Sequence, residues 1–92
     1  MIVRIASEGQ FKLADEVQTK LNELDNEAVA AVEAGDEARF QELFNQMIAL
    51  VEGDGEEVAD DELVESDVII PPKDLTFDEA KGEFTGEGIV PD

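Results

Sequence analysis

Two amphipathic stripes separated by a Gly-Asp pair constrain the fold of this chain more than any other feature. In each stripe, apolar side chains recur at three- and four-residue steps, the first beginning at Val17 and the second at Phe40. This spacing places the apolar residues on one face of a helix. Gly35 provides a stop for the first helix and Asp36 an N-cap for the second. Because so short a link joins only neighbouring helices, we predict an antiparallel helical hairpin over residues 15–52.

A β-hairpin is predicted before the helices, over residues 2–13. Its first half is rich in β-branched residues, and Gly9 closes the turn Ser-Glu-Gly where a positive φ is needed. Arg4 and Lys12 fall one on each strand, which leaves the opposite face of the hairpin for the core. Asp15 is then expected to be the N-cap of the first helix.

The composition changes again after the helical hairpin. Residues 53–62 are dense in carboxylates and contain glycine, so they are expected to form a solvated acidic linker. The remaining part, residues 63–92, begins with a strand over 63–70 that two prolines end. Thr76 and Glu79 then have the spacing of a capping box, which predicts a short final helix.

These elements predict a single α+β domain. A small, mostly antiparallel sheet, made of the N-terminal hairpin and the strand near 63–70, packs on the antiparallel helical hairpin, and a short C-terminal helix follows. The chain has 92 residues and an ordinary hydrophobic fraction of 42%, but only five Phe and no Trp or Tyr. The core must therefore depend largely on aliphatic side chains and a few Phe residues.

The charge of the chain restricts its partners. With 25 acidic and six basic residues the net charge is −19, which repels nucleic-acid phosphates and anionic lipid head groups. Direct nucleic-acid binding and direct membrane insertion are therefore not expected. Two interpretations of the acidity stay open: adaptation to a salty cytoplasm, and complementarity to a basic partner. With no Cys and no apolar run of about 20 residues, the expected location is the cytoplasm, or the membrane periphery through a partner.

The acidic segment does not predict a metal site or a catalytic site. A calcium loop beginning at Asp54 would have Val58 and Ala59 at its fifth and sixth positions, where a ligand and a glycine belong. Asp60 and Asp61 are adjacent carboxylates, but the chain has no His and no nucleophile beside them. We therefore expect no enzymatic activity and no cofactor.

The order of the segments resembles the PspA-associated domain family, PspAA. The resemblance rests on the segments MIVRIASEGQF, LNELDNEAVAAVEAGDEARF, DDELVESDVIIPP and LTFDEAKGEFTGEGIVPD, which together span nearly the whole chain. It implies a partner of PspA, an ESCRT-III-like coiled-coil protein of the phage-shock response to envelope stress. The family has no catalytic residues to transfer, so the resemblance implies an adaptor or regulator.

The sequence also offers candidates for the contact with such a partner. An acidic surface would attract a basic helical partner, and a short apolar patch would hold it. The candidates are Val68, Ile69, Ile70, Phe77 and Ile89 for the patch, and Asp60, Asp61 and Glu62 for the acidic surface.

Core packing is the alternative role of each apolar candidate. The alternative functions are a nucleic-acid mimic and a halophile-adapted domain with another protein partner, and the sequence leaves homo-oligomer formation open.

Overall fold

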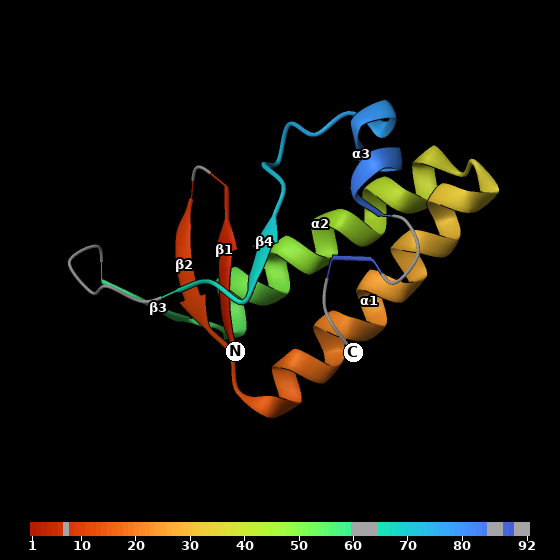
Figure 1. Ribbon diagram of the computed structural model, residues 1–92. Coiled ribbons are helices and arrows are strands. Elements are labelled where there is room, and N and C mark those ends of the chain that lie inside the picture. The colour runs from red at the N-terminus through yellow and green to blue at the C-terminus, as the bar shows by residue number, and fades with distance from the viewer. Residues whose placement is uncertain (7, 60–64, 85–87, 90–92) are drawn as a thin grey trace.

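A four-stranded mixed sheet and a helical hairpin form the two main parts of the structure (Figure 1). The computed structural model describes residues 1–6, 8–59, 65–84 and 88–89. The strands are β1 (Ile2–Ile5), β2 (Gly9–Lys12), β3 (Glu56–Glu57) and β4 (Val68–Ile70). The helices are α1 (Asp15–Ala34), α2 (Glu37–Asp54) and α3 (Phe77–Glu83). The predicted α+β fold, with its helical hairpin and short C-terminal helix, is confirmed.

The sheet is built around β1, in the order β3-β2-β1-β4. β1 pairs antiparallel with β2 and parallel with β4, and β2 pairs antiparallel with β3. Val3 lies opposite both Phe11 and Val68, and Ile5 lies opposite Ile70. Since paired residues share a face of the sheet, these apolar side chains face one way, and Figure 1 shows α2 passing behind the sheet.

The helical hairpin forms as the sequence predicts at its link. α1 ends at Gly35, which has a left-handed φ of 73°, and the carboxylate of Asp36 accepts a hydrogen bond from the Arg39 N–H at 3.1 Å. The prediction for the other end of α1 is wrong. Asp15 is the first helical residue, and the N-cap is Ala14, which has no side chain able to cap. Asp15 still benefits the helix, because a carboxylate in the first turn interacts favourably with the helix dipole.

The predicted solvated linker contains structure that the sequence does not indicate. α2 continues to Asp54, and β3 follows almost at once, with Glu56 opposite Lys12 and Glu57 opposite Phe11 in β2. The backbone pairing and the opposite charges of Glu56 and Lys12 both favour this short strand. Residues 60–64, which include part of the predicted linker and of the predicted strand, lie outside the described residues.

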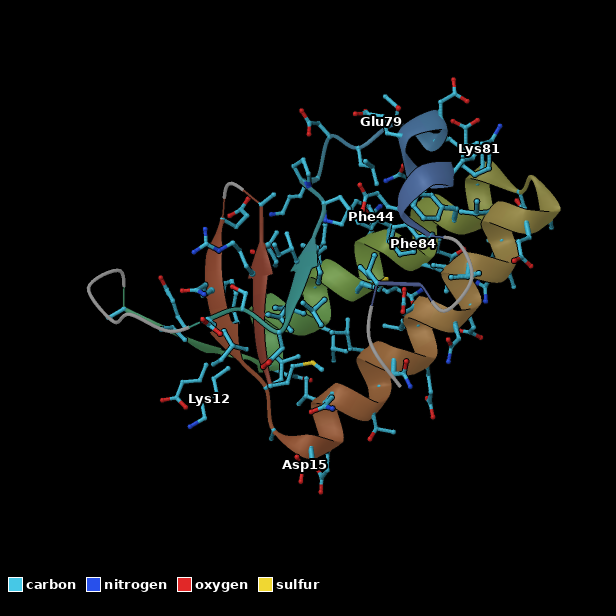
Figure 2. The ribbon with its side chains drawn as sticks, viewed as in Figure 1. Lys12, Asp15, Phe44, Glu79, Lys81 and Phe84 are labelled. Carbon is cyan, nitrogen blue, oxygen red and sulfur yellow. The ribbon has the colours of Figure 1, made fainter. Side chains whose placement is uncertain are left out.

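The final helix is held against the hairpin by aromatic packing. The capping box at its start is present: the Thr76 side chain accepts from the Glu79 N–H, and the Glu79 side chain accepts from the Thr76 N–H. At its end, the ring of Phe84 lies 5.0 Å from Phe40 and 6.0 Å from Phe44 between centroids, edge to face. Figure 2 shows Phe44 and Phe84 side by side where α3 meets α2. α3 is therefore fixed on the hairpin rather than on the sheet.

None of the helices in residues 1–6, 8–59, 65–84 and 88–89 combines the length and the apolar character that crossing a membrane requires.

Replacing Phe84 tests the role of this packing. Phe84 is fully buried, so Phe84→Ala removes a large side chain and leaves a cavity, which should lower the free energy of unfolding by about 3–5 kcal/mol. Phe77→Ala is the control, since Phe77 also contacts Phe40 (5.9 Å between centroids) but is only half-buried. Urea denaturation should give a clearly smaller loss for Phe77→Ala. Equal losses would show that Phe84 has no special part in docking α3.

Candidate functional site

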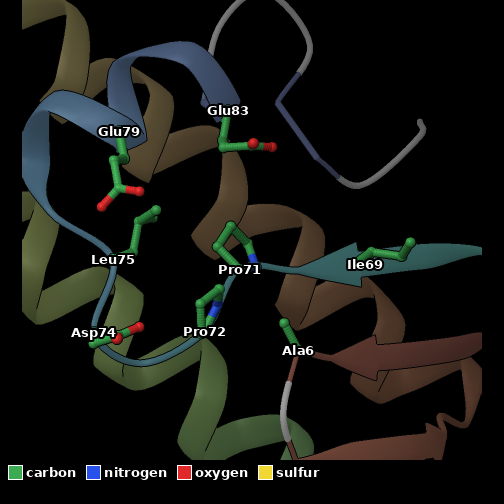
Figure 3. A pocket seen from close by; sticks show the side chains of 8 residues that line it. All are labelled: Ala6, Ile69, Pro71, Pro72, Asp74, Leu75, Glu79 and Glu83. Atoms are coloured by element: carbon green, nitrogen blue, oxygen red, sulfur yellow. The ribbon is translucent and has the colours of Figure 1, made fainter.

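A groove of about 660 Å³ lies between the end of β4 and α3 (Figure 3). Its residues come from the end of β1, from β4, from the loop that follows β4, and from α3. They are Ala6, Ile69, Pro71, Pro72, Asp74, Leu75, Glu79 and Glu83. Figure 3 shows Glu79 and Glu83 extending from α3 toward the loop, with Ile69 at the open end on β4. We refer to this site as the β4–α3 groove.

The alternation of side chains along β4 decides which apolar candidates reach this groove. Val68 and Ile70, two candidates for the apolar patch, are buried in the core, which is the alternative role that the sequence left open for them. Ile69 points to the opposite face, where Arg4 of β1 is its neighbour, and 61% of its surface is exposed. Within the described part of the chain, it is the one large hydrophobic side chain with such exposure.

Carboxylates form the rim of the β4–α3 groove. Asp74, Glu79 and Glu83 are all exposed, and in the described residues none of them has a Lys or Arg nitrogen within 4.0 Å. One oxygen of Glu79 accepts hydrogen bonds from the backbone and hydroxyl of Thr76, which holds this carboxylate at the start of α3. The groove therefore combines apolar residues with three carboxylates that form no ion pair among the described residues.

Lys73 anchors the loop that forms the floor. Its ammonium lies 3.0 Å from a Glu52 oxygen on α2 and 3.3 Å from a Glu8 oxygen in the β1–β2 turn. Hydrogen bonds to Glu52 and Glu8 raise the pKa of Lys73 above its ordinary value of 10.5, so it is protonated at neutral pH. The cation nearest in sequence to Asp74 is thereby directed away from the groove.

Phe77 and Ile89, two other predicted candidates, do not line the β4–α3 groove. Phe77 is half-buried against Phe40, and the ammonium of Lys81 lies 5.2 Å from the centre of its ring. Ile89 is half-buried and packs against the core. The acidic candidates Asp60, Asp61 and Glu62 lie outside the described residues.

A buried carboxylate on α1, which the sequence analysis does not identify, holds the segment that contains Ile89. Asp25 has no exposed surface, and its side chain accepts a hydrogen bond from the Ile89 N–H at 3.1 Å. Gly88 has a left-handed φ of 81°, and a Cβ on it would lie 2.5 Å from an Asp25 oxygen. Only glycine therefore fits here without displacing the carboxylate. The sequence signal for this contact is an aspartate within the apolar stripe of α1.

In the part of the chain that the structure describes, no group of three or more His, Cys, Asp or Glu side chains is arranged to hold a metal ion. What the β4–α3 groove offers instead is an apolar surface beside carboxylates. Such a surface can bury an apolar side chain and pair with an adjacent Lys or Arg.

The comparison with protein families matches this whole chain, residues 1–92, to the model of PspAA, described as PspA-Associated protein. The chain belongs to the PspAA family. The resemblance drawn from the order of the segments is confirmed, and the family's description associates its members with PspA. No curated protein and no solved structure matches this PspAA chain.

The contact between Asp25 and the segment with Gly88 can be tested by two glycine substitutions. Gly88→Ala introduces strain and a collision, so it should lower the free energy of unfolding by about 1–3 kcal/mol and speed amide exchange at Ile89. Gly82→Ala is the matched control: it lies within α3, and its added Cβ meets nothing within 4 Å. This control should gain about 0.5–1 kcal/mol in urea denaturation. A stabilising Gly88→Ala would contradict the contact.

Proposed function

We propose that this PspAA chain is a non-enzymatic adaptor that docks in the cytoplasm on a basic segment of a PspA-type coiled-coil protein, as part of the response to membrane stress. The observation that carries the proposal is the family match over the whole chain. The β4–α3 groove supports it with a surface suited to recognition: it is lined by an exposed apolar residue, Ile69, and by three carboxylates that form no ion pair among the described residues.

Long-range attraction forms the first step of the proposed mechanism. A net charge of −19 produces a negative field around the chain, which raises the rate of encounter with a basic segment. The field weakens as salt screens it, with a screening length of roughly 10 Å at 0.1 M salt. Attraction of this kind accelerates association but does not by itself fix the position of the partner.

Apolar contact at the groove forms the second step. Covering Ile69 would remove an exposed aliphatic side chain from water, which contributes about 1.5–3 kcal/mol for a fully buried residue of this type. The carboxylates of Glu79 and Glu83 border the groove from α3 and can pair with Lys or Arg side chains beside the apolar contact. The occupant therefore combines an apolar side chain with flanking basic residues.

The arrangement of the rim favours an adaptor over a nucleic-acid mimic. A mimic needs carboxylates repeated along one rigid face at the spacing of phosphates. Here Asp74, Glu79 and Glu83 surround an apolar floor that includes Pro71 and Leu75, a composition that nucleic-acid backbones do not share.

Light scattering of the chain mixed with the PspA-type protein of the same organism tests the function. The expected result is a complex at low salt that dissociates as the salt concentration rises. Ile69→Asp should weaken the complex about tenfold or more, because it removes the apolar contact although it adds negative charge.

Ala30→Asp is the matched control for charge, since Ala30 is exposed on α1 and does not line the groove. It should leave the complex intact. The adaptor function is excluded if a folded wild-type chain forms no complex at any salt concentration, and the groove is excluded if both variants bind equally.

A further inference from the structure

A second groove, of about 480 Å³, runs between α1 and α2 and shares no residue with the β4–α3 groove. From α1 it is lined by Lys20, Glu23, Leu24 and Glu27, and from α2 by Gln46, Ala49, Leu50 and Asp54. We refer to it as the hairpin groove. Neither the sequence analysis nor the proposed function assigns a role to it.

Apolar side chains form the centre of the hairpin groove. Leu24 and Leu50 pack against the core from the two helices, yet both are only partly buried. Ala49 beside them is exposed and small, so the helices leave a depression here rather than a ridge. Such a strip, partly exposed along two packed helices, is a surface on which a further apolar face can pack.

The direction of the groove follows from the spacing of its residues. Lys20, Leu24 and Glu27 are four and three residues apart on α1, which is the spacing of neighbours along one helix face. Gln46, Leu50 and Asp54 are each four apart on α2. The groove therefore runs along the hairpin axis. The eight residues from Lys20 to Glu27 span about 10 Å along α1, which is about two turns of an occupying helix.

The backbone of the hairpin decides which secondary structure fits this groove. Its walls are helices, whose backbone N–H and C=O groups are already hydrogen-bonded within each helix. An extended segment would find no backbone partners here, and its own polar groups would be buried unpaired. A helix satisfies its backbone internally and can place an apolar stripe over Leu24 and Leu50.

The charges around the groove select a cationic helix. Glu23, Glu27 and Asp54 provide three carboxylates, whereas Lys20 is the one cation among the lining residues. Arg39 reaches Glu27 at 4.0 Å, but both side chains are about half-exposed and such a pair has little energy. A second copy of this chain would bring its own net charge of −19 and is therefore repelled.

We propose that the hairpin groove is a second docking site, which takes an amphipathic helix with an apolar stripe flanked by Lys or Arg. Such a helix would complete a three-helix arrangement with α1 and α2. Because the two grooves are lined by different residues, one chain can hold two partner segments at once. Two weak contacts to one assembly then act together and bind more tightly than either alone.

The test is a titration of the full-length, ¹⁵N-labelled chain with a synthetic amphipathic peptide that carries a leucine stripe between lysines. The expected result is a continuous set of amide shift changes at Lys20, Leu24, Gln46 and Leu50, which weakens at high salt. A peptide with the same leucine stripe and glutamates in place of the lysines should leave these amides unchanged. Shift changes confined to the β4–α3 groove, or the same changes with the glutamate peptide, would overturn the proposal.

Two matched variants isolate the groove. Gln46→Arg places a cation in it and should weaken peptide binding at these amides roughly threefold or more. Gln41→Arg makes the same change on an exposed part of α2 outside the groove and should bind like the wild type. Equal affinities for the two variants would overturn the site.

Self-association is distinguished by dilution of the chain alone. The proposal expects no shift changes in the hairpin groove on dilution, whereas changes there would identify a second copy as the occupant and overturn it. None of these readouts uses the PspA-type protein: the titrations use a synthetic peptide, and the dilution uses the chain alone. Failure of the PspA-type protein to bind would therefore contradict the proposed function without deciding the hairpin groove.

Discussion

The packing of Phe84 against Phe40 and Phe44 is the interaction on which the candidate site depends. The chain has few aromatic residues, and four of its five phenylalanines gather where α3 meets the hairpin. This cluster fixes α3 on the helical hairpin, and the capping box fixes where α3 begins. Because the groove lies between α3 and β4, its shape follows from aromatic burial far more than from the polar residues that line it.

The charged residues on the rim of this groove determine which kind of partner it can attract. The ammonium of Lys73, next to Asp74 in the loop, pairs with Glu52 and Glu8, and among the described residues the rim carboxylates form no ion pair. The carboxylate of Asp25 has a structural role instead: it is buried and accepts a hydrogen bond from the Ile89 N–H. An acidic chain thus has carboxylates of two kinds, some that hold the fold together and others that a partner can reach.

An element of this fold could be predicted from the sequence where it is determined by residues close together in the chain. It could not be predicted where it depends on a contact with a distant segment. The helical hairpin and the capping box follow from spacings within a few residues. Period-two alternation in β4 places Ile69 on the opposite face from Val68 and Ile70, but with three apolar residues in a row only the structure shows which face is buried. β3 could not be predicted, because Glu56 and Glu57 have low strand propensity and pair only where β2 places a free edge. The position of Asp25 within the apolar stripe of α1 indicates that its carboxylate is buried, but its partner Ile89 lies 64 residues away and no local pattern identifies it.

The central claim is that the β4–α3 groove is where a PspA-type partner binds. Hydrogen exchange of the full-length chain, measured with and without that partner at low salt, tests it most directly. We expect slower exchange over residues 69–83, from the end of β4 through the loop to α3. A stable complex that leaves the exchange of these residues unchanged would show that the partner binds elsewhere on the chain.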